Sequence, residues 1–180
     1  METKRLFIGT FVDSLLFESK LPEIKSDFEI CCKGSWVDVR NLHFTYQFLG
    51  DVEMQHINDI RKAIFDYLSY YESEIEIKGL NALPKVKYPM VLYAQIINKD
   101  NKIIELQQQI GTALEKFGFR IDKRAFKPHI TLLRIKSANR FEFGETIEKY
   151  KDYEFGSMNR FSIGLIESQL TKRGPIYRKI

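Results

Sequence analysis

The chain has few cysteines and no long apolar run. Its only two cysteines, Cys31 and Cys32, are adjacent, and neighbouring cysteines rarely bridge each other, so no disulfide framework is expected. No segment approaches the roughly 20 apolar residues that a membrane-spanning helix needs, and the amino terminus lacks the layout of a signal peptide. We therefore expect a soluble, cytoplasmic protein with no membrane partner.

Histidine is also scarce, with three residues in a chain of 180. The remaining composition is ordinary for a soluble protein, since 44% hydrophobic and 29% charged residues are enough for one packed domain. A net charge of +4 and a pI near 8.9 make the chain mildly basic. This charge suits a polyanionic partner without requiring one.

Two of the three histidines begin the same short pattern. His43–Tyr46 and His129–Leu132 both read His-x-Thr-x, with an apolar or aromatic residue at each x, and both lie in segments predicted as strands. Alternation along a strand places each histidine and its threonine on one face and the x residues on the other. One such motif is common and would be interpreted as structural, but two in matching settings indicate a paired site.

Apolar periodicity predicts an α+β fold with two similar halves, each of which supplies one motif strand. Steps of three and four indicate helices at Met54–Tyr71 and Ile103–Phe117, a short helix at Pro22–Phe28 and a weaker one at Phe143–Tyr150. No low-complexity linker divides the chain, so we take residues 1–180 as a single domain. The predicted strands are Leu6–Val12, Trp36–Val39, Leu42–Leu49, Glu74–Lys78, Met90–Ile97, His129–Ile135, Phe161–Leu170 and Ile176–Ile180.

Two histidines that face one phosphodiester could divide acid and base chemistry between them. The ordinary pKa of histidine, about 6.5, allows one ring to be neutral and another protonated near neutral pH. One ring could take a proton from water while the other gives a proton to the departing oxygen. A threonine hydroxyl beside each ring could donate to the phosphate oxygens. Since water can open a strained cyclic phosphate, the pattern predicts catalysis without a metal or another cofactor.

The third histidine, His56, lies on a predicted amphipathic helix and has no threonine companion. We interpret it as a surface residue. No nearby spacing of cysteine, histidine and aspartate completes a zinc ligand set, so no metal site is expected.

With these motifs and their flanks, the chain resembles the two-histidine phosphoesterases, and within them the RNA 2′,3′-cyclic phosphodiesterases of bacteria and archaea, also called 2′-5′ RNA ligases. The resemblance covers nearly the whole length. Its main departure is Asp13–Cys32, where the long first helix of the family is shortened or irregular. The residues that carry the resemblance are Arg5–Ile8, Trp36, Asn41–Gly50, Phe126–Arg134, Leu165–Ser168 and Gly174–Tyr177.

The resemblance implies a bilobal, pseudo-two-fold fold, in which two antiparallel sheets line a central cleft and helices lie outside. It also implies hydrolysis of a terminal 2′,3′-cyclic phosphate of RNA to a 2′-phosphomonoester without metal. In this family the residue matching His43 donates a proton to the leaving 3′ oxygen, and the residue matching His129 acts as base on water. Thr45 and Thr131 would hold phosphate oxygens.

Three further residues are candidates for substrate binding. Arg134 resembles a family arginine near the phosphate, although strict alternation turns it away from His129 unless a bulge intervenes. Phe48 matches a family aromatic residue near the base, where stacking contributes ~1–3 kcal/mol, whereas alternation places it in the core with Phe44. Tyr177, like Arg5, is a candidate cleft residue with less support.

Two other functions remain open at this point. One is a phosphodiesterase or reversible ligase that acts on 2′-5′ linked or other small nucleotides. The other is a nucleotide- or RNA-binding module without turnover, which the intact histidines of both motifs argue against. The expected partner in the leading interpretation is RNA with a cyclic phosphate end or a cyclic nucleotide, bound by a monomer.

Overall fold

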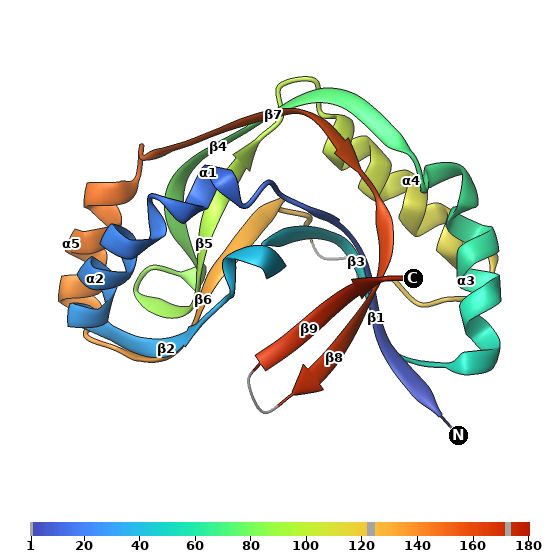
Figure 1. Cartoon of the computed structure of the whole chain (residues 1–180), viewed down its shortest axis with the longest axis horizontal. Helices are drawn as coiled ribbons and strands as arrows, with labels where there is room; N and C mark the ends of the chain where they lie inside the picture. Colours follow the sequence, from blue (N-terminus) through green and yellow to red (C-terminus); the bar gives the residue numbers. More distant parts are fainter. Residues whose placement is uncertain (1, 122–124, 172–173) are drawn as a thin grey trace.

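Two antiparallel sheets form the centre of the molecule. The computed structural model describes residues 2–121, 125–171 and 174–180. Within them, one sheet has the strand order β3-β1-β8-β9 and the other the order β2-β6-β5-β4-β7 (Figure 1). The strands are β1 (Thr3–Phe11), β2 (Cys32–Trp36), β3 (His43–Glu53), β4 (Tyr70–Lys85), β5 (Tyr88–Ile97), β6 (His129–Ala138), β7 (Glu154–Ser162), β8 (Gly164–Thr171) and β9 (Gly174–Lys179).

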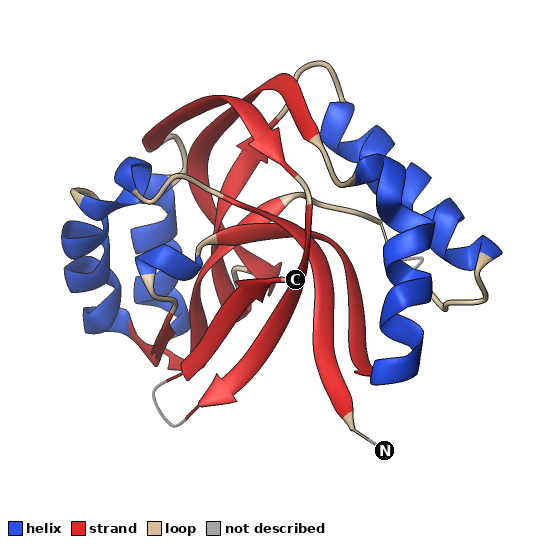
Figure 2. Ribbon diagram, turned by 45° about the vertical axis from the view of Figure 1, so that its right-hand side comes forward, coloured by secondary structure: helices blue, strands red, loops and turns tan. Residues whose placement is uncertain are grey.

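The helices lie on the two outer flanks of the sheets, as Figure 2 shows. Helices α3 and α4 pack against each other, and α4 packs on β3, whereas α2 and α5 pack together behind β2 and β4. The fold is therefore α+β and pseudo-two-fold, as predicted. The helices are α1 (Leu15–Glu18), α2 (Leu21–Cys31), α3 (Ile57–Ile64), α4 (Lys102–Lys116) and α5 (Arg140–Tyr150), with short 3-10 turns at η1 (Val39–Asn41), η2 (Met54–His56) and η3 (Phe65–Tyr67).

The apolar series that predicted a helix to Tyr71 continues past the end of α3. The α-helix ends at Ile64, and Leu68 leaves the helical conformation after η3. The next aromatic residues pair with β7 instead, Tyr70 opposite Ser162 and Tyr71 opposite Phe161. Strand pairing with a distant segment thus overrides the local helical periodicity.

The predicted strand Phe161–Leu170 is in fact two strands that belong to different sheets. The chain leaves β7 at Ser162 and enters β8 at Gly164, so it crosses from the five-stranded to the four-stranded sheet there. Each lobe therefore takes strands from both ends of the chain, and the lobes are not consecutive halves of the sequence. The predicted strand Trp36–Val39 also differs, because β2 ends at Trp36 and η1 begins at Val39.

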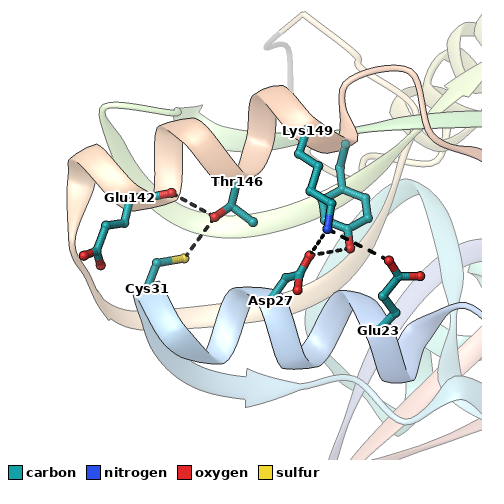
Figure 3. A network of polar contacts seen from close by, with 7 residues as sticks. Glu23, Asp27, Cys31, Glu142, Thr146 and Lys149 are labelled. Carbon is teal, nitrogen blue, oxygen red and sulfur yellow. Dashed lines mark hydrogen bonds and ion pairs between the residues drawn. The ribbon is translucent and has the colours of Figure 1, made fainter.

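Asp13–Cys32, where a shortened or irregular first helix is expected, contains two separate helices, α1 and α2. Polar contacts join α2 to α5 (Figure 3): Asp27 accepts hydrogen bonds from Lys149 and, at 2.8 Å, from Tyr150. Beneath them the Phe28 ring lies 5.4 Å from Phe143 and 5.9 Å from Tyr150, centroid to centroid. The hydrogen bond from Lys149 holds the pKa of Asp27 below its usual range. Helices α2 and α5 are thus held together where they pack on the five-stranded sheet.

Gly34 of β2 allows close contact with the motif strand β6. A methyl group at Gly34 would overlap the carbonyl oxygen of Arg134 and lie 2.9 Å from Leu133 Cδ1. At Gly144 of α5 the nearest atom would be 3.9 Å away. We predict that Gly34→Ala lowers the free energy of unfolding by ~1–3 kcal/mol through this overlap. Gly144→Ala, the control, should raise it by about 0.5–1 kcal/mol because alanine favours a helix.

Urea unfolding of both variants checks this expectation. Equal effects of the two substitutions would show that β2 can move away from β6 at little cost.

Candidate active site

The two motif histidines begin the strands at which the sheets meet. His43 is the first residue of β3 in the four-stranded sheet, and His129 is the first residue of β6 in the five-stranded sheet. The strands β3 and β6 contact each other, and, beside the larger effect of burial, the charge of His129 makes a small contribution to lowering the pKa of His43. Residues from the two sheets, 86 positions apart in the sequence (129 − 43), are thereby brought to one site.

Both rings make the same hydrogen bond to the chain two residues earlier. His43 Nδ1 lies 2.7 Å from the carbonyl oxygen of Asn41, and His129 Nδ1 lies 2.7 Å from that of Lys127. A carbonyl oxygen only accepts, so Nδ1 carries the hydrogen in each ring. The Nε2 atom of each neutral ring is left with its lone pair to exchange a proton with a ligand.

The threonines of the motifs lie on the same strand face as the histidines. Thr45 and Thr131 are half-buried, and within the described part of the chain neither hydroxyl forms a hydrogen bond. Their hydroxyl groups are therefore available to a ligand. The residues between and after them point into the core: Phe44, Tyr46, Ile130 and Leu132 are all buried.

One extra residue follows the threonine in each motif strand. Thr45 pairs with Gly9 but Gln47 with Ile8, which leaves Tyr46 as the extra residue. Likewise Thr131 pairs with Tyr93 but Leu133 with Leu92, which leaves Leu132 as the extra residue. Such a bulge reverses the alternation of side chains beyond it. The third residue after each threonine is therefore turned to the histidine face.

These third residues are Phe48 and Arg134. Arg134 is exposed on the histidine face. The bulge at Leu132 turns it there, as expected from the sequence for an arginine that reaches the phosphate. Of the two alternatives for Phe48, the core position with Phe44 is excluded, because Phe48 is 63% exposed, whereas Phe44 is 0% exposed. Alternation failed here because the bulge at Tyr46 is not visible in the sequence.

A cavity of about 440 Å³ gathers the substrate-binding candidates beside His43. It is lined by Arg5, Phe48, Arg134 and Tyr177 together with His43, and its lining includes no carboxylate among the described residues. In the same part of the chain, the side chain of Arg134 forms no ion pair or hydrogen bond. His129, Thr45 and Thr131 do not line this cavity. Its electrostatics favour an anion.

His43 is enclosed by Tyr177, a candidate from the sequence, and by Phe7 and Phe11, which the sequence did not identify as part of the site. Its ring centroid lies 4.7 Å from Phe7, 4.8 Å from Tyr177 and 6.3 Å from Phe11. Burial lowers the pKa of His43 to about 4; the Asn41 carbonyl opposes this shift, and the charge of Arg134 adds to it. Phe11 lies beside His43 because the pairing of β1 with β3 sets the two residues opposite each other, a register that the sequence does not show.

Asn41 is a second residue that the sequence did not single out. Its carbonyl accepts from His43, and its Nδ2 donates to the carbonyl oxygen of Pro175 at 2.9 Å. Because Pro175 belongs to β9, this residue links the first histidine to the β8–β9 hairpin. Only the pairing of distant segments reveals this role.

The third histidine, His56, is not part of the site. His56 is exposed in η2, which follows the end of β3, and its ring lies 6.5 Å from that of Phe119. Over residues 2–121, 125–171 and 174–180, no three side chains of histidine, cysteine, aspartate or glutamate form a group that could hold a metal ion. In the same ranges no helix is long and apolar enough to cross a membrane.

Comparisons with known proteins agree with this arrangement. The family model of LigT-like phosphoesterases matches residues 97–177. The RNA 2′,3′-cyclic phosphodiesterase of Aquifex aeolicus is 36% identical over 180 residues, covering 98% of this chain and 95% of that protein. The protein of the same name from Methanocaldococcus jannaschii is 34% identical over 178 residues, covering 98% of each.

Solved structures share the fold at lower identity. E. coli LigT in complex with 3′-AMP aligns with a TM-score of 0.78 and 19% identity, covering 99% of this chain and 96% of that one. A protein of Thermus thermophilus aligns with a TM-score of 0.76 and 20% identity, covering 98% and 94%. With full-length relatives above 30% identity, this chain belongs to the family of LigT-like phosphoesterases.

Proposed function

We propose that this protein hydrolyses the 2′,3′-cyclic phosphate at the end of an RNA to a 2′-phosphomonoester, without a metal or other cofactor. The observation that carries the proposal is the pair of histidines from opposite sheets, each with Nδ1 bound to a carbonyl and Nε2 available. The names of the full-length relatives support the same substrate.

In the proposed reaction the two rings move one proton each. His129 Nε2 accepts a proton from water as the water oxygen attacks phosphorus. The bond from phosphorus to the 3′ oxygen breaks, and that oxygen receives the proton of His43 Nε2. The 2′ oxygen keeps the phosphate. His129 ends protonated and His43 neutral, and exchange with solvent restores both rings.

Uncharged and cationic donors would hold the phosphate during the attack. The hydroxyl groups of Thr45 and Thr131 lie on the histidine face of their strands, and Arg134 has no ionic partner among the described residues. Donors that are already in place stabilise the charge that develops on the phosphate oxygens. Phe48 would stack on the terminal base, and Tyr177 would hold the His43 ring from the side.

In this scheme, His43 becomes protonated only when the substrate is bound. With a pKa of about 4, its ring is neutral near pH 7 in the free protein. A bound phosphodiester adds a negative charge between His43 and Arg134, which favours the protonated ring. The substrate would thus supply the charge that makes its own acid catalyst available.

We further propose that the enzyme works as a monomer in the cytoplasm. Both histidines come from one chain, so the site needs no second copy. Cys31 and Cys32 are free and buried thiols, as expected where the surroundings are reducing.

The first prediction from the proposed function concerns the roles of the two histidines. On an RNA with a cyclic phosphate end, His43→Ala and His129→Ala should each lower kcat by roughly 10²–10⁴-fold, because each removes a proton transfer. An aryl phosphodiester whose leaving oxygen departs easily needs no acid, so it should partly rescue His43→Ala alone. The exposed His56→Ala serves as control and should keep the wild-type rate. Rescue of His129→Ala instead would reverse the assignment, and negligible losses in both would refute the proposal.

The second prediction concerns metals. Hydrolysis should continue at an unchanged rate in excess EDTA, since the paired acid and base suffice for a strained phosphate. Rates measured before and after dialysis against the chelator check this. Loss of activity that a divalent ion restores would contradict the proposed mechanism.

The third prediction concerns the charge around His43. In NMR titrations of the imidazole signals, His43 should titrate near pH 4 in the free protein. Arg134→Gln should raise this midpoint, because it removes a positive charge that opposes protonation. Arg61→Gln on the outer helix α3 is the control and should leave it unchanged. An equal midpoint in wild type and Arg134→Gln would show that Arg134 does not act on His43.

A further inference from the structure

A second cavity, of about 1030 Å³, adjoins the His43 cavity. The two share Arg134, Pro175 and Tyr177 in their walls. By contrast, the cavities beside α3 share no lining residue with the His43 cavity. A ligand seated beside His43 therefore has this second cavity as its immediate neighbour.

The second cavity joins an aromatic ring to positive charge. Trp36, at the end of β2, lines it together with Lys25 of α2, and the Lys25 ammonium lies 5.7 Å from the centroid of the Trp36 ring. Among the described residues Lys25 has no carboxylate within 4.0 Å. A ring on which a base can stack, beside a cation for the backbone, is the chemistry of single-stranded nucleic acid binding.

Asp38, the one carboxylate among the described residues of this lining, is neutralised within its own loop. Arg40 binds both carboxylate oxygens of Asp38, at 2.9 Å through Nε and 2.8 Å through Nη2. Asp38 therefore does not oppose the approach of a phosphate. Of the charged residues that line the cavity, Lys25 and Arg134 remain without a carboxylate partner in the described part of the chain.

The chemistry of the substrate sets the direction of the chain. An RNA whose last nucleotide carries a 2′,3′-cyclic phosphate continues only on the 5′ side of that nucleotide. A volume of about 440 Å³ is in the lower part of the range for pockets that hold one small molecule, roughly 300–1,000 Å³. If the last nucleotide fills it, the preceding nucleotide must leave past the shared wall.

We propose that the second cavity binds the nucleotide that precedes the cyclic end, with its base on Trp36 and the connecting phosphate at Lys25. This proposal rests on the proposed function and extends it: the enzyme selects RNA ends over free cyclic nucleotides. Contacts of the preceding nucleotide hold the reacting phosphate in place, so they raise kcat/KM for the longer substrate.

The test compares kcat/KM for 2′,3′-cyclic AMP with kcat/KM for a tetranucleotide that ends in the same cyclic adenosine. The wild type should favour the tetranucleotide. Trp36→Ala should lower the ratio of the two values by about 5- to 150-fold, the size of one base stack. Trp36→Phe should keep part of the preference for the tetranucleotide. Lys25→Gln should also lower the ratio of the two kcat/KM values. Phe65→Ala, an exposed aromatic residue of η3, and Lys62→Gln of α3 are matched controls and should keep the ratio.

The outcomes separate the two proposals. Hydrolysis of neither substrate by the wild type would overturn the proposed function and this inference with it. Hydrolysis of both with an unchanged ratio in Trp36→Ala would overturn the inference alone. Equal losses on both substrates would also overturn it, because they would assign Trp36 a structural role.

Discussion

One additional residue in each motif strand determines which side chains reach the site. Without the bulges at Tyr46 and Leu132, strict alternation would place Phe48 on the core face with Phe44 and Arg134 on the core face with Ile130. With them, each strand presents a histidine and a threonine and then an exposed third residue on the same face. Equivalent positions on the two motif strands therefore carry different side chains, the aromatic ring of Phe48 on β3 and the guanidinium of Arg134 on β6.

The first histidine is fixed through contacts that cross the four-stranded sheet. Its Nδ1 is bound by the Asn41 carbonyl, and the Asn41 side chain is bound to Pro175 on β9. The hairpin that supplies Tyr177 to the His43 cavity is thus connected to the ring that Tyr177 contacts. A displacement of the hairpin would change the orientation of His43 and the shape of the cavity together.

The sequence allowed the fold class and the pairing of the motifs to be predicted, because both depend on local periodicity. The helix α4 and the motif strands follow from apolar spacing within about ten to fifteen residues. The end of α3 and the crossing at Ile163 could not be predicted, since they depend on which distant strand receives Tyr70 and Phe161. The same limit explains why the sequence left two positions open for Phe48, since the direction of its side chain is set by the pairing of β3 with β1.

The different roles proposed for the histidines must come from their surroundings, because their motifs and hydrogen bonds are the same. Three aromatic rings lie around His43, whereas within the described residues only Tyr93 lies beside His129, at 5.2 Å between centroids. A ring with little access to water is neutral until an anion arrives, and then it holds its proton beside the leaving oxygen rather than losing it to solvent. The ring of His129, with one aromatic neighbour among the described residues, is enclosed by fewer apolar groups, which suits a base that acts on water. The asymmetry of the pockets, rather than that of the motifs, therefore favours His43 as the acid.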